Sequence, residues 1–112
     1  MKDEDLDFTT EERARHKVVK LKGKLILHNV EQFRKEFFEL LDQDAKAVLF
    51  DLEDLKFVDS SGIGLLIQLQ RKMAAAGRDI VLMNLNDHVR QLFQVSGLDR
   101  VFKITTEDDL PE

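Results

Sequence analysis

The fold of this chain is decided at residues 59–64, which read Asp59-Ser60-Ser61-Gly62-Ile63-Gly64. An apolar run at 47–50 and a short segment at 55–58 precede this stretch, and a helical pattern continues from it to Ala76. The pattern predicts two hydroxyl groups at the point where a strand and loop end and a helix begins. Backbone N–H groups point outward at a helix start and the helix dipole favours negative charge there, so this position suits a phosphate group.

On either side of this stretch, apolar residues follow strand-like spacing in some segments and helix-like spacing in others. Two short strands are predicted at 18–21 and 25–27, joined by a turn at Gly23. The remaining expected elements are a helix at 30–41, a central strand at 46–52, a helix at 61–76, a strand at 80–83, a short helix ending at Gly97, and a last strand at 101–104. Strands that alternate with helices predict one α/β domain with a mixed, mostly parallel β-sheet flanked by α-helices.

Composition and charge narrow the classes of function. The chain has 112 residues, a formal net charge of -5 and scattered basic residues, so we expect no nucleic-acid partner. Its apolar segments are too short to span a bilayer, so we expect no membrane insertion. The absence of cysteine excludes disulfides and fits a reducing compartment, which indicates a cytoplasmic protein. We expect a monomer in which residues 1–14 form a flexible acidic N-terminal lead-in to a domain at 15–112.

Three roles are open to Ser60 and Ser61: helix cap, catalytic nucleophile and phosphoacceptor. Capping is the ordinary role of Asp or Ser at a helix start. A catalytic serine needs a histidine base and usually a Gly-x-Ser-x-Gly turn, which this stretch lacks. The histidines, His16, His28 and His88, are expected at strand ends or on an exposed helix surface. We therefore predict no catalytic residue and no enzyme activity.

Cofactor and metal sites are not predicted either. Gly62 and Gly64 lack the third glycine of a dinucleotide fingerprint, because Ile67 stands in its place. The acidic residues near the stretch fit a solvated edge better than a magnesium site; they are Asp51, Glu53, Asp54 and Asp59. A phosphate on a serine beside these carboxylates would add about -1.5 to -2 charge and would repel a partner bound there.

The chain also resembles a known family. Residues 52–65, which read Leu-Glu-Asp-Leu-Lys-Phe-Val-Asp-Ser-Ser-Gly-Ile-Gly-Leu, resemble the signature of STAS domains, which include the bacterial anti-sigma factor antagonists. Residues 19–25 resemble the opening hairpin of that family, and residues 89–98 resemble its late helix and turn. The resemblance covers residues 17 to 105 and implies a single STAS domain at 15–112.

The resemblance implies a mechanism called partner switching. Ser60 corresponds to the phosphoacceptor of the family, and Asp59, Ser61, Gly62 and Ile63 lie where the family contacts its partner. The unphosphorylated domain would bind a GHKL-type serine kinase that is also an anti-sigma factor, which frees the sigma factor. Phosphorylation would release the complex, and a PP2C-type phosphatase would restore it. The nucleotide would belong to the kinase, so no cofactor is implied for this chain. The output would be regulation of transcription, as in a stress response.

The resemblance also leaves a second use open. STAS domains serve as adaptor subunits of lipid-transport or stress-signalling complexes. Many antagonists carry a Gly-x-Leu-Asp pattern in the opening segment, whereas Gly23-Lys24-Leu25 is followed here by Ile26. Because that edge contributes to the kinase contact in the family, Ile26 bears on the choice of kinase.

Overall fold

The structure, a computed structural model, describes residues 6–13, 16–40 and 46–106. In these residues the chain forms five strands, three α-helices and one 3₁₀ turn. Their order is β1 (Leu6–Arg13), β2 (His16–Leu25), α1 (Val30–Leu40), β3 (Ala47–Val58), α2 (Ser60–Ala75), β4 (Asp79–Met83), α3 (Asp87–Ser96), η1 (Leu98–Arg100) and β5 (Lys103–Thr105). The predicted α/β class and the alternation of strands and helices are confirmed.

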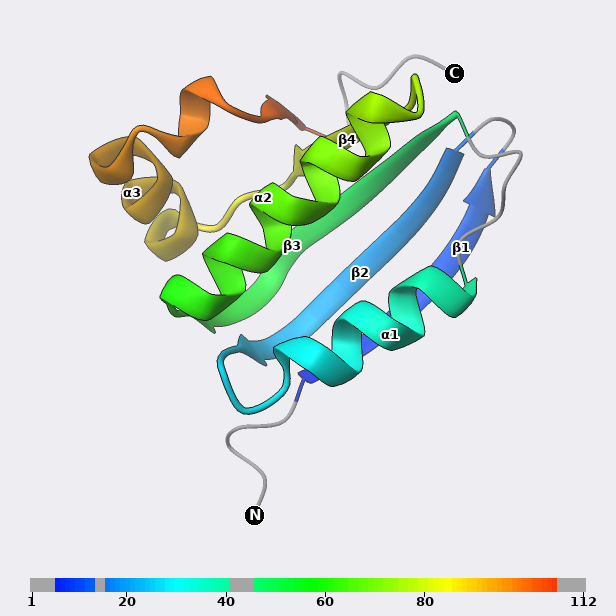
Figure 1. Ribbon diagram of the computed structural model, residues 1–112. Helices are drawn as coiled ribbons and strands as arrows, with labels where there is room; N and C mark the ends of the chain where they lie inside the picture. Colours follow the sequence, from blue (N-terminus) through cyan, green and yellow to red (C-terminus); the bar gives the residue numbers. More distant parts are fainter. Residues whose placement is uncertain (1–5, 14–15, 41–45, 107–112) are drawn as a thin grey trace.

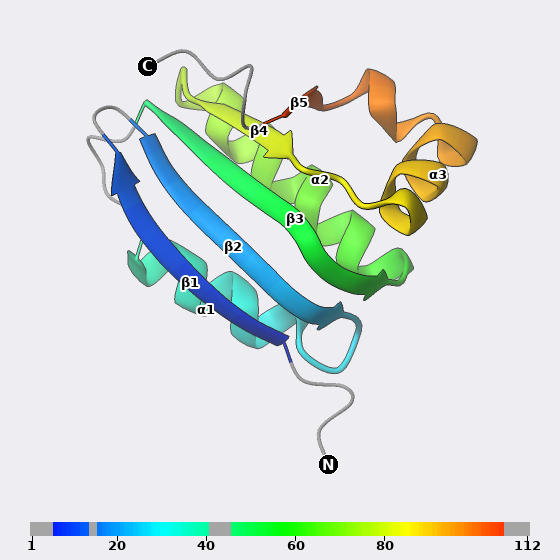
Figure 2. The same ribbon diagram turned by 180° about the vertical axis from the view of Figure 1, so that it is seen from behind.

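One sheet runs through the molecule in the order β1-β2-β3-β4-β5. β1 pairs with β2 in antiparallel orientation, and every later neighbouring pair is parallel, so the sheet is mixed and mostly parallel as predicted. Helices α1 and α2 lie together on one face of the sheet (Figure 1). The view from behind shows the opposite face with no described helix across it (Figure 2).

The core lies between this sheet and the helices. α2 turns Leu65, Leu66, Leu69 and Met73 toward the sheet, which is the spacing of one helical stripe. α1 contributes Phe33 and Phe37, whose rings contact Phe50 of the central strand at centroid distances of 6.4 and 5.6 Å. Each such side chain contributes about 1.5–3 kcal/mol by leaving water, so the two helices are held firmly against the strands.

The first part of the chain differs from the prediction. Residues 6–13 form the edge strand β1, so a flexible lead-in over 1–14 is wrong for that part; residues 1–5 lie outside the described residues. β1 forms because its backbone pairs along β2 from Leu6 opposite Gly23 to Arg13 opposite His16. Backbone pairing does not require apolar side chains at regular spacing. Because this segment lacks such spacing, the sequence did not predict a strand here.

The predicted turn at Gly23 is also wrong. β2 continues through this residue to Leu25 as a single strand. Gly23 has φ of 110°, a conformation that glycine adopts at little cost, and the register against β3 shifts between Gly23 and Lys24. Gly23 therefore lies within one strand, opposite a bulge of β3 between Leu55 and Phe57, and does not form a reversal between two strands.

The central strand is longer than its apolar run. β3 extends beyond the expected end at 52 to Val58, although Glu53 and Asp54 are exposed. Its irregular part is braced by Asn86, whose Nδ2 donates to the carbonyl oxygens of Leu52, Glu53 and Leu55 at 3.2, 3.0 and 2.8 Å. The Asn86 Oδ1 accepts from the N–H of Val89 and so caps α3. One side chain therefore fixes the start of α3 beside the end of β3.

Candidate functional site

The candidate site lies at the edge of the sheet where the parallel strands β2, β3 and β4 end. The loop after β2, the start of α2 and the start of α3 all lie along this edge (Figure 1). Ligands and partners of open α/β sheets commonly bind at the carboxyl ends of the strands, because the connecting loops meet there. The stretch 59–64 stands at this edge, at the junction of β3 and α2.

Asp59 joins two segments that are far apart in the sequence. It is the residue before α2, in extended conformation, and its Oδ1 accepts from the N–H of Gly62 at 2.9 Å. Its Oδ2 accepts from the N–H of Leu27, in the loop after β2, at 3.0 Å. The carboxylate therefore caps the helix and also holds the neighbouring loop against it. The helix cap, which the sequence left open between aspartate and serine, is Asp59.

Gly62 allows α2 to approach the strands closely. A Cβ atom at this position would lie 2.4 Å from the carbonyl oxygen of Leu25 and 2.6 Å from Cγ2 of Val58. Neither distance is possible for real atoms, so any larger residue would push the helix start away from β2 and β3. Gly64, by contrast, has open space around it. Gly62 is buried, so any part it takes in a partner contact is indirect.

The two serines differ in accessibility. Ser60 is the first residue of α2 and is exposed, whereas Ser61 is half-buried. Ile63 is half-buried as well and packs against the main core. Because Asp59 supplies the cap, the Ser60 hydroxyl stands at the helix start without a capping task, and its surroundings are those of a positive dipole end.

Two exposed apolar side chains next to this serine were not identified from the sequence. Leu27 is 72% exposed and sits in the loop that Asp59 holds. Phe57 is 43% exposed, while its neighbour Val58 is buried, so core packing belongs to Val58. The His88 ring of α3 stacks on Phe57 with a centroid distance of 6.3 Å. The sequence signal that could have identified them is their apolar character near the ends of β2 and β3.

The acidic residues near the stretch do not converge. Asp51 is buried on β3 and accepts from the N–H of Glu53, and Asp54 pairs with Lys20 at 3.7 Å. No cluster of three or more potential metal ligands occurs in the described part of the chain. Among the same residues, no hydrogen bond joins a histidine to either serine.

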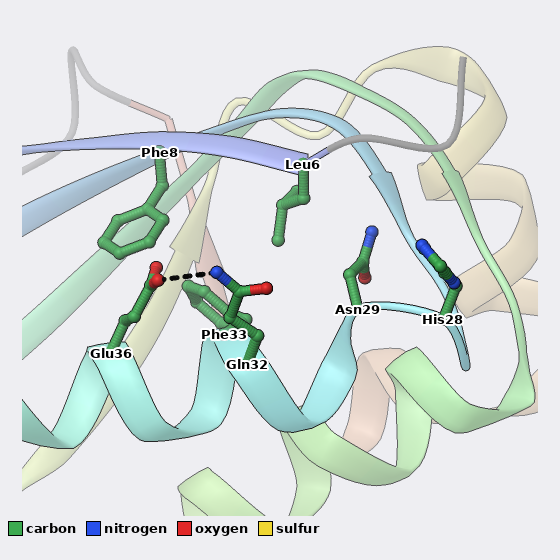
Figure 3. A pocket seen from close by; sticks show the side chains of 7 residues that line it. All are labelled: Leu6, Phe8, His28, Asn29, Gln32, Phe33 and Glu36. Atoms are coloured by element: carbon green, nitrogen blue, oxygen red, sulfur yellow. Dashed lines mark hydrogen bonds between the residues drawn. The ribbon is translucent and has the colours of Figure 1, made fainter. Parts of the chain in front are cut away.

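A cavity of about 240 Å³ lies elsewhere, between β1 and α1. Its walls combine the apolar side chains of Leu6, Phe8 and Phe33 with polar groups from α1 and the loop before it (Figure 3). The Gln32 Nε2 donates to Glu36 Oε2 at 3.0 Å across its rim. None of residues 59–63 lines this cavity, so it is separate from the candidate site.

None of the helices in the described residues is long and apolar enough to cross a membrane. Known proteins are similar to this chain in sequence and in fold. The family model of the STAS domain matches residues 7–111. An anti-sigma F factor antagonist from Lysinibacillus sphaericus is 34% identical over 104 residues, which covers 92% of this chain and 86% of that protein. The solved structure of the anti-sigma factor antagonist SpoIIAA in its unphosphorylated form is 34% identical, with a TM-score of 0.73 over 92% of this chain and 91% of that one.

The phosphorylated form of the Bacillus cell fate determinant SpoIIAA is similar as well. It is 33% identical, with a TM-score of 0.68 over 92% of this chain and 95% of that chain. The chain is therefore similar to these proteins in sequence and in fold over nearly its whole length. The protein belongs to the STAS domain family.

Proposed function

We propose that this protein is an anti-sigma factor antagonist that acts by partner switching, with Ser60 as the phosphoacceptor. The names of its relatives support the regulatory class, because they include anti-sigma factor antagonists that match most of their length. The observation that carries the assignment to this residue is the exposed Ser60 hydroxyl at the first position of α2, beside a cap supplied by Asp59. A kinase can reach this hydroxyl without disturbing the helix.

The partner contact in this proposal is centred on Ser60 and extends to the exposed apolar residues on either side. Leu27 and Phe57 are two of the few large apolar side chains that the described surface exposes, and both lie at the same sheet edge as the serine. Apolar groups surrounded by polar ones are typical of partner-binding surfaces. Ser61 and Ile63 are half-buried and border this area, while Asp59 and Gly62 hold its backbone in place.

A phosphate on Ser60 would then weaken partner binding without unfolding the domain. The helix start tolerates a phosphate, since its N–H groups and dipole favour negative charge. The partner would meet about -1.5 to -2 additional charge beside the Asp59 carboxylate, and both charges would have to leave water in the complex. Repulsion and desolvation would therefore release the partner while the domain stays folded.

The other components follow from this role. The partner is a GHKL-type serine kinase that is also an anti-sigma factor, and it supplies ATP and the catalytic groups. A PP2C-type phosphatase removes the phosphate and restores the binding form. This chain itself performs no catalytic step and holds no cofactor, and it works where ATP and sigma factors are present, in the cytoplasm.

The test is phosphorylation of the protein by candidate GHKL kinases with ATP, followed by intact mass spectrometry and peptide mapping. We expect one phosphate on Ser60 and none in Ser60→Ala. The matched variant is Ser61→Ala, which keeps the phosphoacceptor and should still carry its phosphate on Ser60. Calorimetry should show that Ser60→Ala retains kinase binding while Ser60→Asp weakens it. A phosphate on Ser61, or full binding by Ser60→Asp, would contradict the proposed switch.

The alternative use is a STAS adaptor subunit in a lipid-transport or stress-signalling complex. Its supporting observation is the apolar loop at Ile26 and Leu27, where many antagonists carry aspartate. Stable binding to a partner without any phosphorylation would favour the adaptor over the switch.

A further inference from the structure

The edge strand β1 leaves one long side of the sheet open. Among the described residues β1 pairs only with β2, and no strand lies beyond it in the sheet, while α1 lies behind it on one face (Figure 2). Its register against β2 runs over eight residues without a shift, so no bulge interrupts it. Every second residue of such a strand directs its N–H and C=O groups away from the neighbour, which makes the edge a template for another strand.

Several devices that usually protect an edge strand are missing in β1, and the charged side chains that it does carry are of both signs. β1 contains no proline and no lysine, whereas β5, at the other edge, is protected by its length of only three residues. The side chains of Thr9, Thr10 and Glu11 are exposed along the open strand. A regular, exposed edge of this kind favours pairing with a second chain.

The charges on β1 select one register for pairing with a second copy. In an antiparallel pair around a two-fold axis, residues opposite each other have numbers with a constant sum. With the axis at Thr10, Asp7 of each copy faces Arg13 of the other, which makes two symmetric pairs of opposite charge. An axis at Thr9 would set Asp7 against Glu11, and an axis at Glu11 would set two carboxylates against each other.

The other face of the strand accepts this register as well. Phe8 would lie opposite Glu12 of the second copy, whose carboxylate is already neutralised by Lys17 at 2.8 Å. The Arg13 Nε donates to Glu11 of its own strand at 3.3 Å, which holds the guanidinium on the same face as Asp7. Opposite charges that face each other across strands stabilise the pair, and like charges destabilise it.

We propose that β1 is a homodimerisation strand, which pairs antiparallel with β1 of a second copy around Thr10 and joins two sheets into one. A monomer was the default expectation from the sequence, and the edge strand at residues 6–13 now offers a surface for a second copy. The β1 surface runs along one side of the sheet, whereas Ser60 lies where β3 ends and α2 begins. The dimer therefore leaves Ser60 of both copies open to phosphorylation. A single strand pair is small for an interface, so the association is weak and needs high protein concentration.

The first experiment is sedimentation velocity over a range up to several hundred micromolar, roughly the regime of weak interfaces. We expect a reversible dimer in the wild type. Asp7→Arg should raise the dissociation constant roughly tenfold, because attraction becomes repulsion at two symmetric sites. The double variant Asp7→Arg with Arg13→Asp should restore dimerisation. A monomer at every concentration, or a dimer that ignores both variants, would overturn the proposal.

The absence of cysteine provides a second, independent readout. Thr10→Cys would place two thiols opposite each other on the axis, at the Cα separation of about 4.5–5.5 Å that suits a disulfide. We expect rapid cross-linking on mild oxidation. Thr9→Cys is the matched control, because Thr9 is equally exposed but would face Glu11 of the second copy. Equal cross-linking of the two variants would contradict the register, and circular dichroism would check that each variant is folded.

Discussion

Replacing Asp59 by asparagine removes one of two bonds that a single carboxylate makes. The carboxylate accepts from the N–H groups of Gly62 and Leu27 at 2.9 and 3.0 Å. Asparagine keeps one acceptor oxygen but presents an N–H₂ donor in place of the other, so one of the two N–H groups faces a donor. The bond to Gly62 is partly buried and the bond to Leu27 is exposed, so we expect asparagine to keep the helix cap and lose the loop contact.

The magnitude follows from the type of bond that is lost. A hydrogen bond to a charged group contributes about 1.5–3 kcal/mol, and the lower end applies where water can replace it, as at the Leu27 amide. Loss of the negative charge at the helix start costs about 0.3–1 kcal/mol more. We expect Asp59→Asn to lower the free energy of unfolding by about 2–2.5 kcal/mol and Asp59→Ala, which loses both bonds, by about 3–5 kcal/mol.

Urea unfolding followed by circular dichroism measures these values, since the chain has no tryptophan or tyrosine for fluorescence. Hydrogen exchange at single amides separates the two bonds: the Leu27 amide should lose protection in Asp59→Asn more than the Gly62 amide does. Asp54→Asn is the matched control, because Asp54 makes an exposed pair with Lys20 and the variant should change stability by less than about 1 kcal/mol. Equal stability of Asp59→Asn and wild type, with unchanged exchange at Leu27, would refute the reasoning.

Three further predictions concern the same sheet edge. Gly62→Ala should destabilise the fold by about 1–3 kcal/mol through overpacking against Leu25 and Val58, whereas Gly64→Ala, in open space, should be neutral or raise stability by up to about 1 kcal/mol in thermal unfolding. Asn86→Asp should keep the cap of α3 but lose the three bonds to β3 carbonyls, and it should cost about 1–3 kcal/mol in urea unfolding. Leu27→Ser should weaken kinase binding in calorimetry by at least about 1 kcal/mol without loss of stability.

Each of these predictions has an outcome that contradicts it. Similar stability of the two alanine variants would show that the helix start adapts to a Cβ at Gly62. Unchanged stability of Asn86→Asp would mean that water satisfies the β3 carbonyls. Val95→Ser is the control for Leu27, since Val95 is 81% exposed and lies near the C-terminal end of α3. Equal losses of binding in both serine variants would place the contact elsewhere.

Much of the fold was predictable from local pattern. The elements β3, α2 and α3 were predicted from signals that depend on residues close together in the chain. These signals are the apolar run of β3, the helical spacing of α2 and the glycine at 97 that ends α3. β1 was missed because apolar and polar residues alternate only at its start, where Leu6 and Phe8 are apolar. The rest of the strand is polar. Its strand conformation comes from pairing with β2, and the residues of β1 alone do not indicate that pairing.

The candidate site was predictable in part for the same reason. The stretch 59–63 was identified because its residues are adjacent in the chain, and the prediction that Ser60 is its phosphoacceptor still awaits the kinase assay. The sequence left open which residue caps α2, and it did not show that Phe57 is exposed while Val58 is buried. Both answers depend on the direction of the chain as it leaves β3, which the bulged pairing with β2 and the bonds from Asn86 decide.

By itself, the sequence determined the alternation of strands and helices from α1 onward, the helix start at the Asp-Ser-Ser-Gly stretch and the family to which the chain belongs. Those properties are local, because each depends on side chains within one or two turns or one strand. The tertiary structure alone decided that Asp59 reaches Leu27 across 32 positions, that His88 stacks on Phe57, and that residues 6–13 form an open edge. These contacts join segments that are distant in the sequence, so they exist only when the packed sheet and helices bring those segments together.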